Sequence, residues 1–257
     1  MYYDIQGSGE PLVLIPGFAS GAWSWSWQVD EFAKNFRVIT FDPPGISRSE
    51  IGVDEVVSIE SIADDVVALL DELTIGSANV LGISFGGFVA LDLAIRFPNR
   101  MKRLVLASTS FGGPNHVAPS VDVMAAFTST DGLNSADRIR HYLTVAFSPE
   151  FVDTNGGTVD KFCELREKNS VTREVYLQQL QAALEFDVED KVNSIMTDTL
   201  VVTGDSDVVV PMQNSCNLAA AIPNAELEII SGSGHMAFIE SAGDFNRTVV
   251  NFLKGSR

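Results

Sequence analysis

The chain has 257 residues, of which 46% are hydrophobic, so it can build a sizeable core and a disordered chain is excluded. Its 34 acidic residues outnumber its 17 basic residues, which gives a net charge of −17 at pH 7. A chain of this charge repels nucleic-acid backbones, and no cluster of Lys or Arg offsets the repulsion, so we expect no nucleic-acid partner.

Short apolar, β-branched runs alternate along the chain with longer segments of helical period. The runs that we predict as strands are Leu12–Ile15, Arg37–Phe41, Ala78–Ile83, Arg103–Ala107, Thr199–Thr203 and Glu226–Ile230. Largely apolar strands of this kind are typical of sheets that are covered on both faces. The pattern therefore predicts an α/β fold with a mostly parallel, twisted sheet flanked by helices.

Two helices are predicted between the early strands. The first begins at Ser61, where Ser61 and Asp64 have the spacing of a capping box ahead of an apolar stripe. The second extends from about Gly86 to Phe97. It ends before Pro98, because proline disfavours helical backbone in the residue that precedes it.

A helical insertion is predicted between two late strands. The alternation of strands and helices lapses after Arg103–Ala107, and helical periods follow in Ser135–Phe147 and Thr172–Glu185. We therefore expect a core of residues 1–110 and 192–257, with residues 111–191 forming a cap. Such an insertion usually covers the carboxyl ends of the strands as a lid, where α/β sheets bind ligands. The alternative is a subdomain that only adds stability.

The segment Gly82-Ile83-Ser84-Phe85-Gly86 connects an apolar strand directly to a helix, which is the context of a nucleophile elbow. Such a turn strains the serine backbone, and side chains at Gly82 or Gly86 would collide with neighbouring backbone. We expect the Ser84 hydroxyl to stand above the sheet edge as a nucleophile. The Phe85 N–H, at the helix start, should then face developing negative charge. An ordinary Gly/Ser turn is the alternative.

A serine nucleophile needs an adjacent base, normally a histidine held by a carboxylate. The chain contains three histidines. His116 and His141 fall in the predicted cap, and we interpret them as solvated or packing residues. His235 instead follows Gly232-Ser233-Gly234 on a loop after the last predicted strand. We therefore predict His235 as the base.

Two carboxylates are candidates for the third partner. Asp205 and Asp207 both follow the strand predicted at Thr199–Thr203. Their loop and the His235 loop leave the same edge of a parallel sheet, so either aspartate can approach His235. Position alone does not choose between them.

We expect no metal and no organic cofactor. The segment Gly232–Ala237 fits the dinucleotide pattern G-x-G-x-x-A, but too little chain follows it for the second strand and its ribose-binding acid. Cys163 and Cys216 lie far apart and lack the spacing of metal ligands or of a disulfide framework. With no leader-like N-terminus and no apolar run of membrane-spanning length, we expect a cytoplasmic protein without a membrane partner.

The chain resembles the α/β-hydrolases, in particular single-domain esterases, lactonases and haloperoxidase-like enzymes, over essentially its whole length. Besides the elbow, Asp42–Ser49, Gly204–Pro211 and Gly232–His235 are similar to the family's D-x-x-G-x-x-x-S, G-x-x-D-x-x-x-P and histidine loops. The resemblance implies that Asp207 is the acid. The nucleophile, acid and histidine then follow one another in the order that this fold uses.

The resemblance also implies that the backbone N–H of Phe18 is the second oxyanion donor, beside that of Phe85. The family normally reads His-Gly-x at this point, whereas this chain reads Pro16-Gly17-Phe18. Phe18 can still donate, but the imidazole that braces the loop in the family is replaced by a proline, which only restricts φ. Trp23, Trp25 and Trp27, just beyond, either line a pocket or pack, and we favour packing.

The sequence therefore predicts a serine hydrolase that cleaves a small, mainly apolar carboxylic ester, thioester or lactone through an acyl-enzyme on Ser84. Two alternatives keep the same triad. One is an enzyme that hydrolyses a C–C bond or performs cofactor-free perhydrolysis. The other is a ligand receptor of the same fold whose triad is nearly idle.

Overall fold

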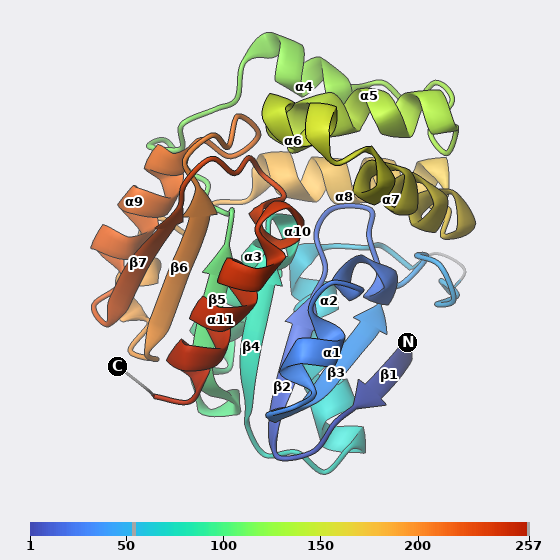
Figure 1. The fold of residues 1–257 in the computed structure, drawn as a ribbon. Helices are drawn as coiled ribbons and strands as arrows, with labels where there is room; N and C mark the ends of the chain where they lie inside the picture. Colours follow the sequence, from blue (N-terminus) through green and yellow to red (C-terminus); the bar gives the residue numbers. More distant parts are fainter. Residues whose placement is uncertain (53–54, 256–257) are drawn as a thin grey trace.

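The computed structural model describes residues 1–52 and 55–255, which contain a twisted seven-stranded sheet with the order β1-β3-β2-β4-β5-β6-β7 (Figure 1). The strands are β1 (Tyr2–Gln6), β2 (Glu10–Ile15), β3 (Phe36–Asp42), β4 (Ala78–Ile83), β5 (Met101–Ala107), β6 (Thr199–Gly204) and β7 (Ala225–Ile230). Strand β1 pairs with β3 in antiparallel orientation, and the other neighbouring strands are parallel. The predicted fold class is confirmed.

Helices cover both faces of this sheet. They are α1 (Val29–Phe32), α2 (Ile59–Glu72), α3 (Phe85–Arg96), α4 (Val121–Thr128), α5 (Ala136–Ala146), α6 (Pro149–Thr154), α7 (Gly156–Lys168), α8 (Arg173–Glu185), α9 (Met212–Ala221), α10 (Ala237–Glu240) and α11 (Ala242–Leu253), with short 3₁₀ turns at Ala22–Trp25, Pro98–Arg100 and Val192–Ser194. None of the helices in the described ranges is both long enough and apolar enough to cross a membrane.

The alternation of side chains along the strands creates two cores. In β2, Leu12 and Leu14 point to the face that α1 and α11 cover, and Val13 and Ile15 point to the face that α2, α3 and α9 cover. All four side chains are at most 1% exposed. Because both faces of the sheet are buried, apolar residues predominate in its central strands.

The N-terminus of α2 corrects the helix start predicted at Ser61. Ser58, not Ser61, is the N-cap: its Oγ accepts the Ser61 N–H at 3.0 Å, and Ser61 Oγ accepts the Ser58 N–H at 2.9 Å. The earlier start adds Ile59 to the buried face of the helix. Strand β1 was not predicted either, because it is a largely exposed edge strand without an apolar run.

Five helices, α4 to α8, lie between β5 and β6 in the chain and over the carboxyl ends of the strands (Figure 1). We call them the cap helices; they fall within the segment 111–191 that the sequence predicted as a cap. A hydroxyl side chain caps four of them by accepting a backbone N–H three residues on, at Ser120, Ser135, Ser148 and Thr172. Such caps satisfy amide groups that a helix start leaves free.

The connection from β4 to α3 is made by one residue, Ser84, with φ 53° and ψ −119°. Two glycines allow this turn. A Cβ atom on Gly82 would lie 2.2 Å from the Gly86 carbonyl oxygen, and one on Gly86 would lie 2.3 Å from the Ile15 carbonyl oxygen. Backbone therefore approaches backbone on both sides of Ser84, as the elbow prediction requires.

Alanine at position 82 should destabilise the protein. Gly82→Ala pushes a methyl group into backbone that cannot move aside, so we expect the free energy of unfolding to fall by at least about 1–3 kcal/mol. Gly76→Ala is the matched control, because nothing lies within 4 Å of a Cβ atom there. Urea denaturation of both variants measures the difference, and equal midpoints would contradict the close approach.

Candidate active site

Three side chains from distant parts of the chain are linked by hydrogen bonds at the carboxyl end of the sheet. His235 Nε2 lies 3.0 Å from Ser84 Oγ, and His235 Nδ1 lies 2.9 Å from Asp207 Oδ2. Ser84 stands between β4 and α3, Asp207 follows β6, and His235 follows β7. His235 and Asp207 are 2% and 5% exposed, so water competes little for these bonds.

The backbone fixes the Asp207 carboxylate. Its Oδ1 atom accepts the N–H groups of Val209 and Val210 at 2.9 and 2.8 Å, which leaves Oδ2 for the imidazole. Asp205 is exposed and points elsewhere, because it accepts hydrogen bonds from the Ser231 hydroxyl and the Gly232 N–H. Of the two aspartates that sequence position left open, Asp207 is the one that meets His235.

The loop that carries His235 is held by the cap helices. The Met236 N–H donates to the Ala146 carbonyl oxygen at 3.1 Å. The Glu240 carboxyl accepts the Gly234 N–H at 2.9 Å and, from the start of α6, the Ser148 N–H at 3.0 Å. Burial raises the pKa of Glu240. The cap helices and the C-terminal part of the core thus fix the backbone on both sides of the imidazole.

Two backbone N–H groups, those of Phe85 and Phe18, belong to segments that lie next to Ser84. Phe85 is the first residue of α3, where amide groups have no partner within the helix. Phe18 lies on the loop after β2, and a Cβ atom on the preceding Gly17 would lie 3.7 Å from Ser84 Cβ. No residue in the described ranges accepts a hydrogen bond from either group. Both are therefore free to donate to an oxyanion beside Ser84.

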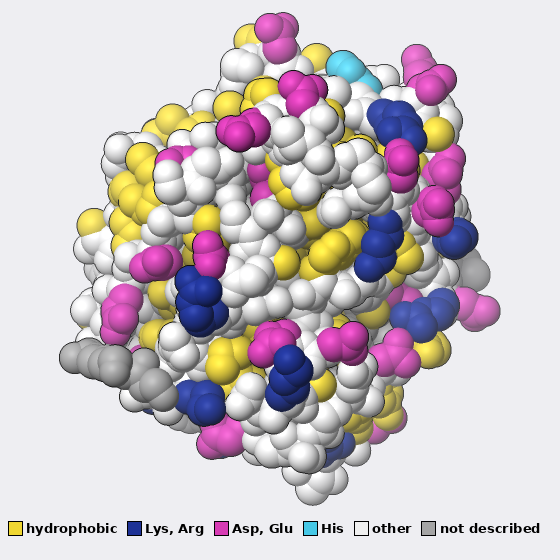
Figure 2. Space-filling model, in the orientation of Figure 1, with side chains coloured by type: hydrophobic (Ala, Val, Ile, Leu, Met, Phe, Trp, Pro, Cys, Tyr) yellow, Lys and Arg dark blue, Asp and Glu magenta, His cyan; other side chains and the backbone are white. Residues whose placement is uncertain are grey.

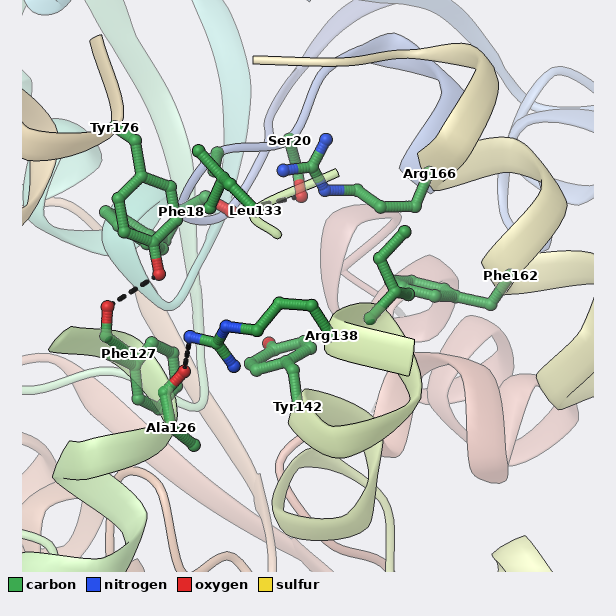
Figure 3. A pocket seen from close by; sticks show the side chains of 12 residues that line it. Phe18, Ser20, Ala126, Phe127, Leu133, Arg138, Tyr142, Phe162, Arg166 and Tyr176 are labelled. Carbon is green, nitrogen blue, oxygen red and sulfur yellow. Dashed lines mark hydrogen bonds between the residues drawn. The ribbon is translucent and has the colours of Figure 1, made fainter. Parts of the chain in front are cut away.

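A pocket opens beside this loop, between the core and the cap helices (Figure 3). Most of its lining is apolar or aromatic. The lining residues are Phe18, Ala19, Ser20, Ala126, Phe127, Leu133, Arg138, Ile139, Tyr142, Phe162, Arg166 and Tyr176. The predicted packing role of the tryptophans agrees with this lining, which contains none of them; Trp23 and Trp25 are buried in the core instead.

Two arginines extend from α5 and α7 into the pocket (Figure 3). Arg166 is 8% exposed, and its one hydrogen bond within the described chain is to the Asn169 carbonyl oxygen at 2.8 Å. Arg138 donates to the carbonyl oxygens of Ala126 and Ser129. No Asp or Glu of the described residues lies within ion-pair distance of either arginine. Burial lowers the pKa of the Arg166 guanidinium.

The remaining candidates lie outside this arrangement. His141 is exposed on α5, and His116 is half-buried before α4 with a pKa that burial lowers. Cys163 and Cys216 form no disulfide. Within residues 1–52 and 55–255, no group of three or more His, Cys, Asp or Glu side chains is placed to hold a metal ion.

A family model described as alpha/beta hydrolase fold matches residues 10–242. The chain belongs to the α/β-hydrolase family. The fold is the one that the sequence resemblance implied, and the chain is a hydrolase. The hydrogen bonds link Ser84, Asp207 and His235, whose order along the chain is the one that the resemblance implied.

Three relatives span nearly the whole chain. It is 32% identical to the 2-hydroxymuconate semialdehyde hydrolase of Pseudomonas sp. (strain CF600), over 96% of this chain and 88% of that protein. It is 26% identical to a protein of Caulobacter sp. (strain K31) that is named as a carbamate hydrolase. That match covers 99% of this chain and 96% of that protein. The enol-lactonase from Burkholderia xenovorans LB400 superposes with a TM-score of 0.83, at 27% identity, covering 98% of this chain and 96% of that one.

Sequence reasoning did not single out the pocket arginines. Arg138 and Arg166 occur among other charged residues on amphipathic helices, where a charged side chain normally faces water. Nothing in the local pattern separates Arg166 from Lys168, and only the packing of α7 against α5, α6 and the turn Ala22–Trp25 turns Arg166 inward.

Replacing Asp207 by asparagine should prevent His235 from acting as the base for Ser84. In Asp207→Asn, the Val209 and Val210 N–H groups hold the amide oxygen, so its NH₂ group must face His235 Nδ1. That contact forces the tautomer that carries its proton on Nε2, which cannot accept the Ser84 proton. We expect kcat for a nitrophenyl ester to fall by about 10⁴-fold. Asp205→Asn is the control and should change kcat little; equal losses would contradict the assignment.

Proposed function

We propose that this protein is a serine hydrolase that cleaves a small carboxylic ester or lactone through an acyl-enzyme on Ser84. The observation that carries the proposal is the buried series of hydrogen bonds from Ser84 through His235 to Asp207. A hydroxyl, an imidazole and a carboxylate in this order activate a serine for attack on a carbonyl carbon.

In the proposed cycle, Ser84 Oγ bonds to the carbonyl carbon while His235 Nε2 accepts the hydroxyl proton. Asp207 stabilises the imidazolium that forms. The N–H groups of Phe18 and Phe85 donate to the oxyanion, and one such donor is worth about 2.7–4 kcal/mol of barrier. His235 then gives the proton to the leaving alcohol as the C–O bond breaks. Water repeats both steps on the acyl-enzyme and releases the acid.

The pocket favours a substrate that is mainly apolar and ends in an anionic group. Seven of its twelve lining residues are purely apolar, whereas Arg138 and Arg166 bring two positive charges. A buried charge is normally paired, because burial without a partner is costly. Since neither arginine has an acidic partner among the described residues, a carboxylate on the substrate would complete the site.

We further propose that residues 111–191 act as the lid of this pocket, over a core of residues 1–110 and 192–257. Nine of the twelve lining residues come from the cap, so substrate enters and leaves a space that the cap encloses. The cytoplasmic location stays a prediction from the sequence.

Hydrolysis of a C–C bond is the second candidate, because the chain is 32% identical to a 2-hydroxymuconate semialdehyde hydrolase. The same triad and the same pocket arginines would serve a dienoate substrate. A panel of nitrophenyl esters, a lactone, a carbamate and a 2-hydroxy-6-oxodienoate separates the candidates by kcat/KM.

Removing the hydroxyl of Ser84 should abolish catalysis without unfolding the protein. We expect Ser84→Ala to lose labelling by a fluorophosphonate probe and at least about 10⁴-fold in kcat for a nitrophenyl ester. Ser206→Ala, an exposed serine on the Asp207 loop, is the control and should label normally. Labelling of Ser84→Ala would contradict the nucleophile, and failure of the wild type to label would favour the idle receptor.

Neutralising Arg166 should weaken the binding of acid-bearing substrates only. For Arg166→Met we expect KM for the nitrophenyl monoester of glutaric acid to rise by about 10–100-fold, the worth of a charged hydrogen bond. KM for the uncharged nitrophenyl pentanoate should stay nearly constant. Arg140→Met is the control, since Arg140 pairs with Asp160 outside the pocket. A parallel rise for both esters would contradict an anion subsite.

A further inference from the structure

The loop that carries the second oxyanion donor has little support of its own. Pro16 stands where the family has a bracing histidine, and proline has no N–H to donate. Within the loop, the Ser20 N–H donates to the Gly17 carbonyl oxygen at 3.2 Å. That carbonyl shares a peptide plane with the Phe18 N–H, so this bond influences where the N–H points. A weak internal bond of this kind leaves the plane free to tilt unless another group holds the loop.

That other group comes from a cap helix 160 residues away. Gln179 of α8 accepts the Ala19 N–H with its Oε1 atom at 2.8 Å, and Gln179 is 1% exposed. In the described chain it is the one side chain from outside the loop that is hydrogen-bonded to residues 16–20. Ala19 has a φ of 51°, a strained conformation for a residue with a Cβ atom, so its N–H direction depends on an external partner.

A second side chain on the same face of α8 supports the contact. Tyr176, one turn before Gln179, packs edge-on against the Phe18 ring with centroids 4.6 Å apart. Its hydroxyl donates to the Phe127 carbonyl oxygen at 2.7 Å, which fixes the ring (Figure 3). The side chain of Phe18 and the amide that follows it are thus both held by α8.

We propose that Gln179 is a positioning residue for the oxyanion hole: it takes the bracing role that Pro16 cannot fill and aligns the Phe18 N–H with the carbonyl oxygen that Ser84 attacks. This inference rests on the proposed acyl-enzyme function. If the inference holds, the Phe18 N–H is aligned only while Gln179 of α8 is hydrogen-bonded to the Ala19 N–H. The contact acts on the transition state, because the oxyanion forms after substrate has bound.

The experiment compares neighbouring glutamines on α8. Gln179→Met removes the oxygen that accepts the Ala19 N–H and keeps a similar side-chain volume. Gln179→Asn keeps an amide oxygen but shortens the side chain by one methylene group, so the oxygen lies farther from the Ala19 N–H. Gln179→Glu keeps an acceptor oxygen. The matched control is Gln178→Met, because Gln178 Oε1 also accepts a backbone N–H, that of Val57, at 3.0 Å but away from the site. For each variant we would measure kcat and KM for a nitrophenyl ester, Ki for a boronic acid that mimics the tetrahedral intermediate, and Tm.

We expect Gln179→Met and Gln179→Asn to lower kcat by about 10–100-fold, part of the 10²–10³-fold effect of losing one oxyanion donor. Their boronic-acid Ki should rise by a similar factor while KM changes by less than about threefold. Gln179→Glu should recover most of kcat, and Gln178→Met should match the loss in Tm without the loss in kcat. If Gln179→Met does not fold, kcat, Ki and Tm of Gln179→Asn and Gln179→Glu are compared with those of Gln178→Met instead.

The inference is overturned if the Gln179 variants keep wild-type kcat and Ki, or if their losses follow Tm as closely as those of Gln178→Met. Failure of the proposed function is recognised separately, because the wild type would then neither hydrolyse the ester nor react with a fluorophosphonate.

Discussion

The backbone of Ser84 lies in a sterically unfavourable region, φ 53° and ψ −119°, and the site is built around this residue. The conformation costs about 1–3 kcal/mol and persists only where surrounding bonds enforce it. The Ser84 N–H donates to the Ala107 carbonyl oxygen at 2.9 Å, and its own carbonyl accepts from the Gly87 N–H and the Thr109 hydroxyl at 2.8 and 2.9 Å. Strand β5 and helix α3 thus hold the elbow. The turn brings a hydroxyl and a free N–H, that of Phe85, to one edge of the sheet.

The cap helices do more than enclose a pocket. Gln179 of α8 holds the loop that carries Phe18, and Ala146 of α5 holds the loop that carries His235. The loop that carries Phe18 and the loop that carries His235 are therefore both in hydrogen-bond contact with the same inserted segment. If the cap helices moved to admit substrate, as in the proposed lid role, the hydrogen bonds that hold the Phe18 and His235 loops would change with them.

Charge is distributed unevenly between the surface and the pocket. On the face in Figure 2, acidic side chains are widely scattered and Lys and Arg stand apart from one another, in keeping with the net charge of −17. The pocket instead holds Arg138 and Arg166 without acidic partners among the described residues. The surface repels large polyanions, whereas in the proposed function the two pocket arginines would attract a small anionic group of the substrate.

The sequence by itself determined the strand alternation, the elbow at Gly82–Gly86 and the choice of His235 among three histidines. Each of these depends on consecutive residues whose backbone sterics or apolar pattern act locally, so single-sequence reasoning could reach them. The local pattern did not distinguish Asp205 from Asp207 as the partner of His235, and the choice of Asp207 came from the family resemblance.

The tertiary structure shows that Asp207 is the aspartate that meets the imidazole, and it alone decided that Arg166 turns inward and that Gln179 reaches Ala19. The start of α2 at Ser58 belongs here too, because the earlier start is the one that buries Ile59, which is 3% exposed. These features depend on contacts between segments far apart in the chain. A charged or amide side chain on an amphipathic helix looks the same in sequence whether it faces water or a catalytic loop, and only the packing of that helix makes the difference.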